Sequence, residues 1–242
     1  MKGKNRLISA AFMGIILALT AFSGKAQVEG NGNVVKVERK VSGFKAVAVS
    51  NGINLLVSQG SEEKVVVEAE ENLIQYIRTE VSDETLRIGI HGNNGSFNSH
   101  KKINVYVTAK ELNALEANSG SRLKSENRIK TGNLKISSSS GSSIIVEVAC
   151  VNLDASASSG SSGIISGSAA TLTAEGSSGS SLVASELVAE KGNISASSGS
   201  VVVVHITKEI KADASSGGRI VVSGNPAIKD TDSSSGGSVH FK

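Results

Sequence analysis

A serine–glycine pair recurs through the second half of the chain at nearly constant spacing. Seven of its copies share one register, with successive glycines separated by 21, 19, 19, 20, 18 and 19 residues. A flexible Ser/Gly linker has no reason to keep such a period, whereas a solenoid of stacked coils requires one. The pairs are Ser119-Gly120, Ser140-Gly141, Ser159-Gly160, Ser178-Gly179, Ser198-Gly199, Ser216-Gly217 and Ser235-Gly236.

Apolar positions repeat in step with these pairs. The residues three and five places before each glycine, and three and five places after it, are mostly aliphatic or small, and the residues between them are mostly polar. Alternation with a period of two is typical of a strand with one buried face, so each repeat is predicted to hold two strands joined by a corner. One such coil cannot bury its apolar face alone, but stacked coils enclose a narrow aliphatic column between parallel strands.

We therefore predict an all-β protein whose main part is a right-handed parallel β-helix, or β-solenoid, with coils of about 19 residues. The solenoid is expected over residues 111–242, and a less regular β-rich segment over residues 27–110 is expected to continue into it. At each corner, glycine would supply the unusual backbone angles. The hydroxyl of the preceding serine would bond either to backbone groups left open where the strand breaks or to its counterpart one coil away.

Three segments before residue 111 carry local signals of their own. Asn51-Gly52 lies between two strand candidates and predicts a hairpin or a corner. Residues 70–77 form the one stretch with the pattern of a helical turn. Residues 91–101, rich in Gly, Asn and Ser, are expected to form an exposed loop.

Residues 1–26 have the layout of a secretory signal peptide. Lys2, Lys4 and Arg6 precede an apolar run over residues 7–22, and Gly24-Lys25-Ala26 is an acceptable cleavage site. The run is too short for a membrane span, and no cysteine follows it to carry a lipid; a retained amino-terminal anchor is the alternative. We predict an exported protein with no membrane span after cleavage, located in the periplasm, on the outer-membrane surface or outside the cell.

Cleavage also changes the charge of the chain. The signal segment removes four of the 25 basic residues and none of the 22 acidic ones, which leaves 21 basic residues and shifts the net charge from +3 to −1. The mature chain thus gives no electrostatic reason to expect nucleic acid as a partner. Cys150 is the only cysteine, which excludes an internal disulfide, and it is interpreted as a small buried apolar group.

The amino-terminal half resembles a known family. Its segment from residue 43 to residue 90 contains Phe44, Gly52-Ile53-Asn54, Gln59-Gly60, Asn72-Leu73 and Leu86-Arg87-Ile88. With the Ser-Gly repeats that follow, these features are similar to the head GIN domain family, also called putative auto-transporter adhesins, over nearly the whole mature chain. The resemblance implies an exported envelope protein with a right-handed β-helix-like fold, whose activity is uncharacterised. It supplies no catalytic residue, and we interpret the Gly52-Ile53-Asn54 triplet as fixing a turn.

Enzymes that act on polysaccharides also occur on β-helices, and they would need converging acids here. The acidic residues expected on the outside lie on different coils: Glu116, Asp154, Glu175, Asp213 and Asp232. Asp154 and Asp213 are three corners apart, roughly 14 Å along the axis, which is too far for an acid/base pair. The four histidines, His91, His100, His205 and His240, show no metal-ligand spacing, so no metal or cofactor is predicted.

The leading hypothesis is an exported, non-enzymatic β-solenoid that acts as an adhesin or cell-envelope binding module. Its partner would be a surface glycan, a peptide or an envelope polymer. The alternatives are a polysaccharide lyase or hydrolase and a purely structural periplasmic scaffold. Aromatic residues make up only 3% of the chain, so a sugar-stacking platform is not expected. The repeated hydroxyls are either a surface for many weak bonds or a solvated scaffold.

Overall fold

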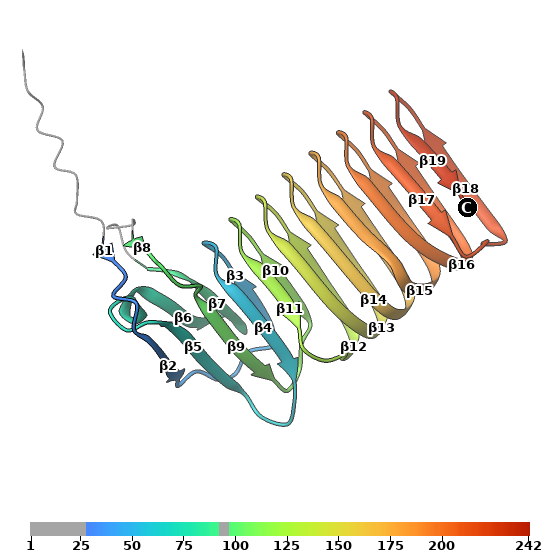
Figure 1. Cartoon of the computed structure of the whole chain (residues 1–242). Helices are drawn as coiled ribbons and strands as arrows, with labels where there is room; N and C mark the ends of the chain where they lie inside the picture. Colours follow the sequence, from blue (N-terminus) through green and yellow to red (C-terminus); the bar gives the residue numbers. More distant parts are fainter. Residues whose placement is uncertain (1–27, 92–96) are drawn as a thin grey trace, which may run out of the picture.

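Parallel strands stacked coil upon coil form most of the molecule, as the computed structural model shows (Figure 1). The structure describes residues 28–91 and 97–242, so the export signal expected over residues 1–26 lies outside them. Strands on either side of each Ser-Gly pair join their equivalents in the next coil in parallel register. In β14 and β15, for example, Gly163 pairs with Leu182, and Ala174 pairs with Ile194. The predicted all-β solenoid is confirmed.

The seven predicted repeats are built from ten strands. These are β10 (Ala114–Ala117), β11 (Arg122–Ser125), β12 (Ile129–Ser138), β13 (Ser143–Ala157), β14 (Ser162–Gly176), β15 (Ser181–Ala196), β16 (Val201–Ala214), β17 (Arg219–Ser223), β18 (Ile228–Ser233) and β19 (Ser238–Phe241). Each long strand, such as β14, follows one Ser-Gly corner and leads into the next, so it contributes to both sides of the stack.

The stacking starts before residue 111. β3 (Ala46–Val49) pairs in parallel with β10, and β4 (Asn54–Gln59) pairs in parallel with β11. β7 (Thr85–Ile90) and β9 (Asn104–Ala109) lie on the other side of that coil, again in parallel. Two further coils therefore belong to the solenoid, and their order in space differs from their order in the chain.

Antiparallel strands close the amino-terminal end of the stack. β5 (Lys64–Glu70) pairs antiparallel with β9 and with β2 (Val34–Arg39), and β6 (Ile77–Ser82) pairs antiparallel with β7. These strands form a cap at this end of the stack (Figure 1), and Val65, Val67 and Ala69 of β5 are buried in the aliphatic core. Through β5 and β6 the cap pairs the outer edges of β9 and β7, which would otherwise be open to another chain, and β2 and β6 become the edge strands.

The interior is a narrow column of aliphatic side chains, as the alternation predicted. Five places before the first six corner glycines, Leu115, Ile136, Ala155, Ala174, Ile194 and Ala212 are all at most 1% exposed, whereas Thr231 in the last repeat is exposed. Glycines occur where a neighbour leans across the column: a Cβ added at Gly163 would lie 2.7 Å from Leu182 Cδ1. Large and small residues are thus matched between coils, and the column leaves little room for added volume.

The local signals before residue 111 meet different outcomes. The helical turn expected in residues 70–77 is a 3₁₀ turn, η1 (Ile74–Tyr76). The expected loop over residues 91–101 is in part a strand, because β8 (Phe97–Asn98) pairs in parallel with β1 (Val28–Glu29). Asn51-Gly52 forms a corner and not a hairpin, since β3 and β4 pair with neighbouring coils. Within the described ranges, no helix has the length and apolarity needed to cross a membrane.

Candidate binding face

Each Ser-Gly pair forms a left-handed corner. The backbone angle φ is 47–52° at the seven serines and 68–79° at the seven glycines. The glycine N–H donates to the serine carbonyl of the next coil, as from Gly120 to Ser140 over 3.0 Å. The serine side chains are exposed, and among the described residues their hydroxyls make no hydrogen bond. The pair therefore fixes the corner through its backbone, and the hydroxyl bonds that we expected from it are made elsewhere.

The serine that follows the glycine makes those bonds. It is buried, with at most 2% exposure, in the first five repeats: Ser121, Ser142, Ser161, Ser180 and Ser200. Ser180 Oγ donates to the Ala157 carbonyl of the preceding coil over 2.8 Å and accepts from the Ser177 N–H over 3.1 Å. The sequence prediction did not include this column, although serine follows the glycine in the first five repeats and this recurrence is the signal that marks it.

Removing one of these hydroxyls should weaken the stack. We expect Ser180→Ala to lower the free energy of unfolding by about 1 kcal/mol, because the Ala157 carbonyl and the Ser177 N–H lose a buried partner. Chemical denaturation followed by circular dichroism measures the change. Ser178→Ala is the matched control, since its hydroxyl is exposed and unbonded in the described structure, and an equal effect of both variants would contradict the assignment.

The Gly52-Ile53-Asn54 triplet lies at the corner of the β3–β4 coil. Asn51 and Gly52 have φ angles of 62° and 71°, and the Gly52 N–H donates to the Ser119 carbonyl over 3.0 Å, as in the Ser-Gly corners. Ile53 is fully buried at the place that serine occupies in later repeats. Asn54 Nδ2 donates to Asn104 Oδ1 in the neighbouring coil over 3.1 Å. The triplet builds a corner, and Asn51 is the corner residue that faces a surface hollow.

The outer side of the strands that lead into the corners forms what we call the serine face. Its row nearest the corners lies two places before each glycine and consists of Ser50, Asn118, Ser139, Ser158, Ser177, Ser197, Ser215 and Ser234. The next row, four places before the glycine, carries further hydroxyls, and Ser156 Oγ donates to Ser137 Oγ one coil away over 3.2 Å. Parallel pairing repeats these groups at the strand spacing of roughly 4.8 Å.

An amide-lined trough runs along the far edge of this face. Its volume is about 590 Å³, and Asn113, Asn133, Asn152 and Thr171 line it. Asn152 Nδ2 donates to Asn133 Oδ1 over 2.8 Å, so the amides form a ladder across coils. Amides and hydroxyls both donate and accept hydrogen bonds, which suits a ligand rich in hydroxyl groups.

The acids considered for catalysis are not brought together. Asp154 is in register with Thr173, which pairs with Asn193, which pairs with Lys211, so Asp154 and Asp213 are three coils apart. Among the described residues, no group of three His, Cys, Asp or Glu side chains is placed to hold a metal ion. Cys150 is half-buried, and desolvation raises the pKa of its thiol. The described geometry thus assembles polar surfaces without a converging acid/base pair.

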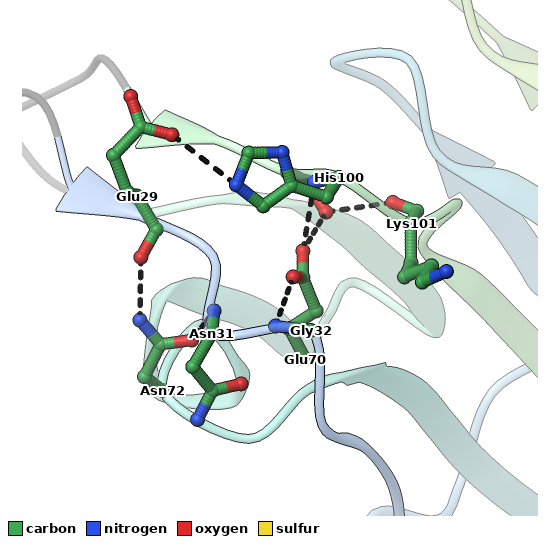
Figure 2. A network of polar contacts seen from close by, with 8 residues as sticks. Glu29, Asn31, Gly32, Glu70, Asn72, His100 and Lys101 are labelled. Atoms are coloured by element: carbon green, nitrogen blue, oxygen red, sulfur yellow. Dashed lines mark hydrogen bonds and ion pairs between the residues drawn. The ribbon is translucent and has the colours of Figure 1, made fainter.

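A buried carboxylate in the cap holds three segments together (Figure 2). The Glu70 side chain accepts hydrogen bonds from Gly32 N over 2.7 Å, from Ser99 Oγ over 2.7 Å and from His100 N over 3.0 Å. The bond from Ser99, followed by those from the backbone amides, lowers the pKa of Glu70 below its ordinary value. Around it, His100 Nε2 lies 3.5 Å from a carboxylate oxygen of Glu29. The ionised carboxylate therefore acts as a structural acceptor.

The comparisons with known proteins agree with this architecture. A family model described as “Putative auto-transporter adhesin, head GIN domain” matches residues 43–226. The crystal structure of a “putative adhesin” from Bacteroides fragilis has a TM-score of 0.82 at 19% identity, covering 89% of this chain and 100% of that one. A “putative adhesin” from Parabacteroides merdae has a TM-score of 0.71 at 20% identity, covering 89% and 99%.

A third similar structure carries a different description. It is a “Putative lipid binding protein” from Parabacteroides distasonis, with a TM-score of 0.73 at 20% identity, covering 90% of this chain and 100% of that one. At this level of identity, the three similarities establish the shared fold alone. No curated protein matches the sequence.

Proposed function

Because the chain belongs to the head GIN domain family, described as a “Putative auto-transporter adhesin”, we propose that it is an exported, non-enzymatic adhesion module. The proposed ligand is a hydroxyl-rich polymer of the cell surface or its surroundings, such as a glycan. The proposed binding surface is the serine face with its trough. The observation that carries the proposal is the row of serine side chains on this face, which recurs in each coil from Ser139 to Ser234 beside the amide and hydroxyl pairs that join β12 and β13.

The chemistry of the face favours many weak contacts over one tight one. Without aromatic rings to stack on, a sugar is held mainly by hydrogen bonds, each of which competes with water. A polymer lying along the solenoid meets a serine of the row nearest the corners in every coil from Ser139 to Ser234, and each further contact is intramolecular once the first has formed. Such avidity suits attachment to a surface.

The alternatives receive less support. A polysaccharide lyase or hydrolase would need the acids near one point, and Asp154 and Asp213 lie three coils apart. A purely structural periplasmic scaffold would not need to reach the outside of the cell. Fractionation of cells followed by surface labelling of the mature protein separates these roles, because a protein confined to the periplasm is not labelled.

Binding is tested first with the mature protein on an array of glycans and matrix polymers, and then by calorimetry with the polymer that is captured. We expect the double variant Asn133→Ala/Asn152→Ala to weaken that binding about tenfold or more, because two amides of the trough are lost. Ser162→Ala/Ser181→Ala is the matched control, since these outward residues lie on the strands that leave the corners. No captured polymer, or equal losses in both variants, would count against the proposal.

The opposite side of the solenoid offers a second kind of surface, which the same measurements address. Ile145 and Ile164 are each 44% exposed and lie in register with Val183 and Val203, so they form an aliphatic row across coils. A ligand with an acyl chain would cover such a row, as the lipid-binding description of one similar structure suggests. If the protein cosediments with phospholipid vesicles and captures no glycan, this aliphatic row is the binding surface and the serine face is not.

A further inference from the structure

A small hollow lies at the amino-terminal end of the serine face, beside the first corner. Its volume is about 280 Å³, and residues of β3, β6, β7 and β10 line it. Gly89 of β7 stands beside Ser50, where later coils have serine. A Cβ at Gly89 would lie 2.8 Å from Ser50 Oγ, so the glycine opens space that any other residue would fill.

Two arginines line this hollow. Arg87 is exposed, and within residues 28–91 and 97–242 its guanidinium makes no ion pair or hydrogen bond. Arg78 is bonded through Nε to Glu80 over 3.2 Å, so its terminal NH₂ groups keep their donors. Glu80 is directly opposite Arg87 in the β6–β7 ladder but pairs with Arg78. A guanidinium presents a planar fork of donors that matches the two oxygens of a carboxylate.

The remaining polar groups of the hollow suit hydroxyls. Asn51 Oδ1 accepts from Ser50 Oγ over 2.8 Å, and Asn118 Oδ1 accepts from Ser139 Oγ. The amide oxygens of both residues are therefore engaged by serine hydroxyls, and their NH₂ groups remain as donors. Glu116, which lines the same hollow, carries a carboxylate whose oxygens only accept. Two amide donors and one carboxylate acceptor beside a guanidinium pair are the set that a sugar acid would use.

The charge of the rest of the face limits the ligand to a single acidic group. Beyond the hollow, its outward rows carry more carboxylates than ammonium groups. The acids are Asp154, Glu175, Asp213, Asp230 and Asp232, and the lysines are Lys135 and Lys211. A polymer with a negative charge on every unit would place like charges opposite one another along the solenoid. A neutral chain that ends in one acidic unit avoids this repulsion.

We propose that the hollow binds the carboxylate of an acidic sugar, of the uronic acid type, at the end of a glycan chain. Arg87 and Arg78 hold the carboxylate, Asn51 and Asn118 donate to hydroxyl or ring oxygens, and Glu116 accepts from a hydroxyl group. The inference rests on the proposed function, because it names the chemical class that anchors a glycan on the serine face. The hollow binds the terminal acidic unit of the glycan, and the hydroxyl rows of the serine face contact the sugar units that follow.

The test titrates the full mature chain with methyl β-D-glucuronoside and with methyl β-D-glucoside, which lacks the carboxylate. Nuclear magnetic resonance follows the arginine Nε–Hε signals, so that the site as well as the affinity is read. We expect the glucuronoside to shift the signals of Arg78 and Arg87 and to bind at least about tenfold more tightly than the glucoside. Inorganic sulfate and a free amino acid serve as competitors of other classes.

Variants separate charge from shape. Arg87→Gln and Arg78→Gln should each weaken glucuronoside binding about tenfold or more. The matched control is Arg122→Gln, because Arg122 is exposed on the other side of the corner and is unpaired in the described structure. Gly89→Ala combined with Ser50→Ala adds a methyl group to the wall of the hollow without changing its charge and should weaken binding, whereas Ser50→Ala alone should preserve it.

The outcomes distinguish this inference from the proposed function. Equal binding of glucuronoside and glucoside, or no effect of the two arginine variants, overturns the inference even if the array captures a glycan through the trough. Tighter binding of sulfate or of the amino acid overturns the sugar assignment. Another outcome is that the array captures no glycan while the glucuronoside still binds specifically at the two arginines. That result overturns the polymer-binding role of the serine face and supports the binding site in the hollow.

Discussion

Replacing Ala174 with leucine is expected to lower the free energy of unfolding by about 1–3 kcal/mol. Ala174 is fully buried and is in register with Ala155 on one side and Ile194 on the other. Leucine adds three carbon atoms to a column that is already filled, so neighbouring side chains must leave their preferred rotamers or the coils must separate. Urea denaturation, followed by circular dichroism, measures the shift in midpoint.

The same strand provides the control for this substitution. Ala170 also lies in β14 but is exposed, so Ala170→Leu should change stability by no more than about 0.5 kcal/mol. Ile194→Ala, added to Ala174→Leu, removes volume from the adjacent coil and should restore part of the loss. An unchanged midpoint for Ala174→Leu would mean that the column is looser than its burial indicates.

Loss of the Glu70 carboxylate should open the cap before the coils unfold. In Glu70→Ala, Gly32 N, Ser99 Oγ and His100 N lose their acceptor. The two amides are then donors without a partner, whereas Ser99 Oγ keeps the Lys101 carbonyl as an acceptor. These losses fall at an end of the molecule where local opening is separable from global unfolding. Hydrogen exchange of the Gly32 and His100 amides should become at least about tenfold faster, which corresponds to the smallest effect of one lost partner.

The effect of pH on the cap follows from the same carboxylate. Because folding lowers the pKa of Glu70, its contribution to stability is fully present above the ordinary carboxyl pKa of 4.5 and is lost as the pH falls through the lower folded value. Amide exchange in the wild-type cap, corrected for its intrinsic pH dependence, should therefore accelerate below about pH 4.5. Glu70→Ala should lack this step, and Glu71→Ala, which alters an exposed neighbour, should keep it.

The repeats of the solenoid were predictable because their local and global signals agree. The apolar residues recur with a period of two inside each strand and with a period near 19 between coils, so one alignment locates corners, strands and core together. The prediction was incomplete at the corners. Serine is common both at the left-handed position and at the buried position after it, and composition does not tell an exposed hydroxyl from a buried one.

The first coils were harder to recognise, although their residues fit the same columns. Val47 and Val49 stand five and three places before Gly52, and Leu55 and Val57 stand three and five places after it, and all four are buried. Strands β5 to β9 separate this coil from β10, so the distance from Gly52 to the next corner glycine is 68 residues (120 − 52) and the period is lost.

The candidate hollow could not be foreseen from the sequence. Arg78 and Arg87 lie on β6 and β7, which are neighbours in the chain, but Asn118 directly follows β10. A parallel register that skips sequence order brings the three residues together. The trough was closer to prediction, because its amides recur at the repeat spacing, at residues 133 and 152. Long-range register, which pairs distant strands, decides such sites.

Because each coil bonds only to its neighbours, the number of coils sets the length of the solenoid. Duplication of one 19-residue unit in the middle, for instance the segment between Gly160 and Gly179, would keep every corner bond and lengthen the rod by one strand spacing, roughly 4.8 Å. The amino-terminal cap and the two arginines of the hollow would stay unchanged, while their distance from the carboxy-terminal coil would increase. The length of the solenoid and the residues of the hollow can thus change independently. Evolution can add or remove coils without altering the proposed binding site.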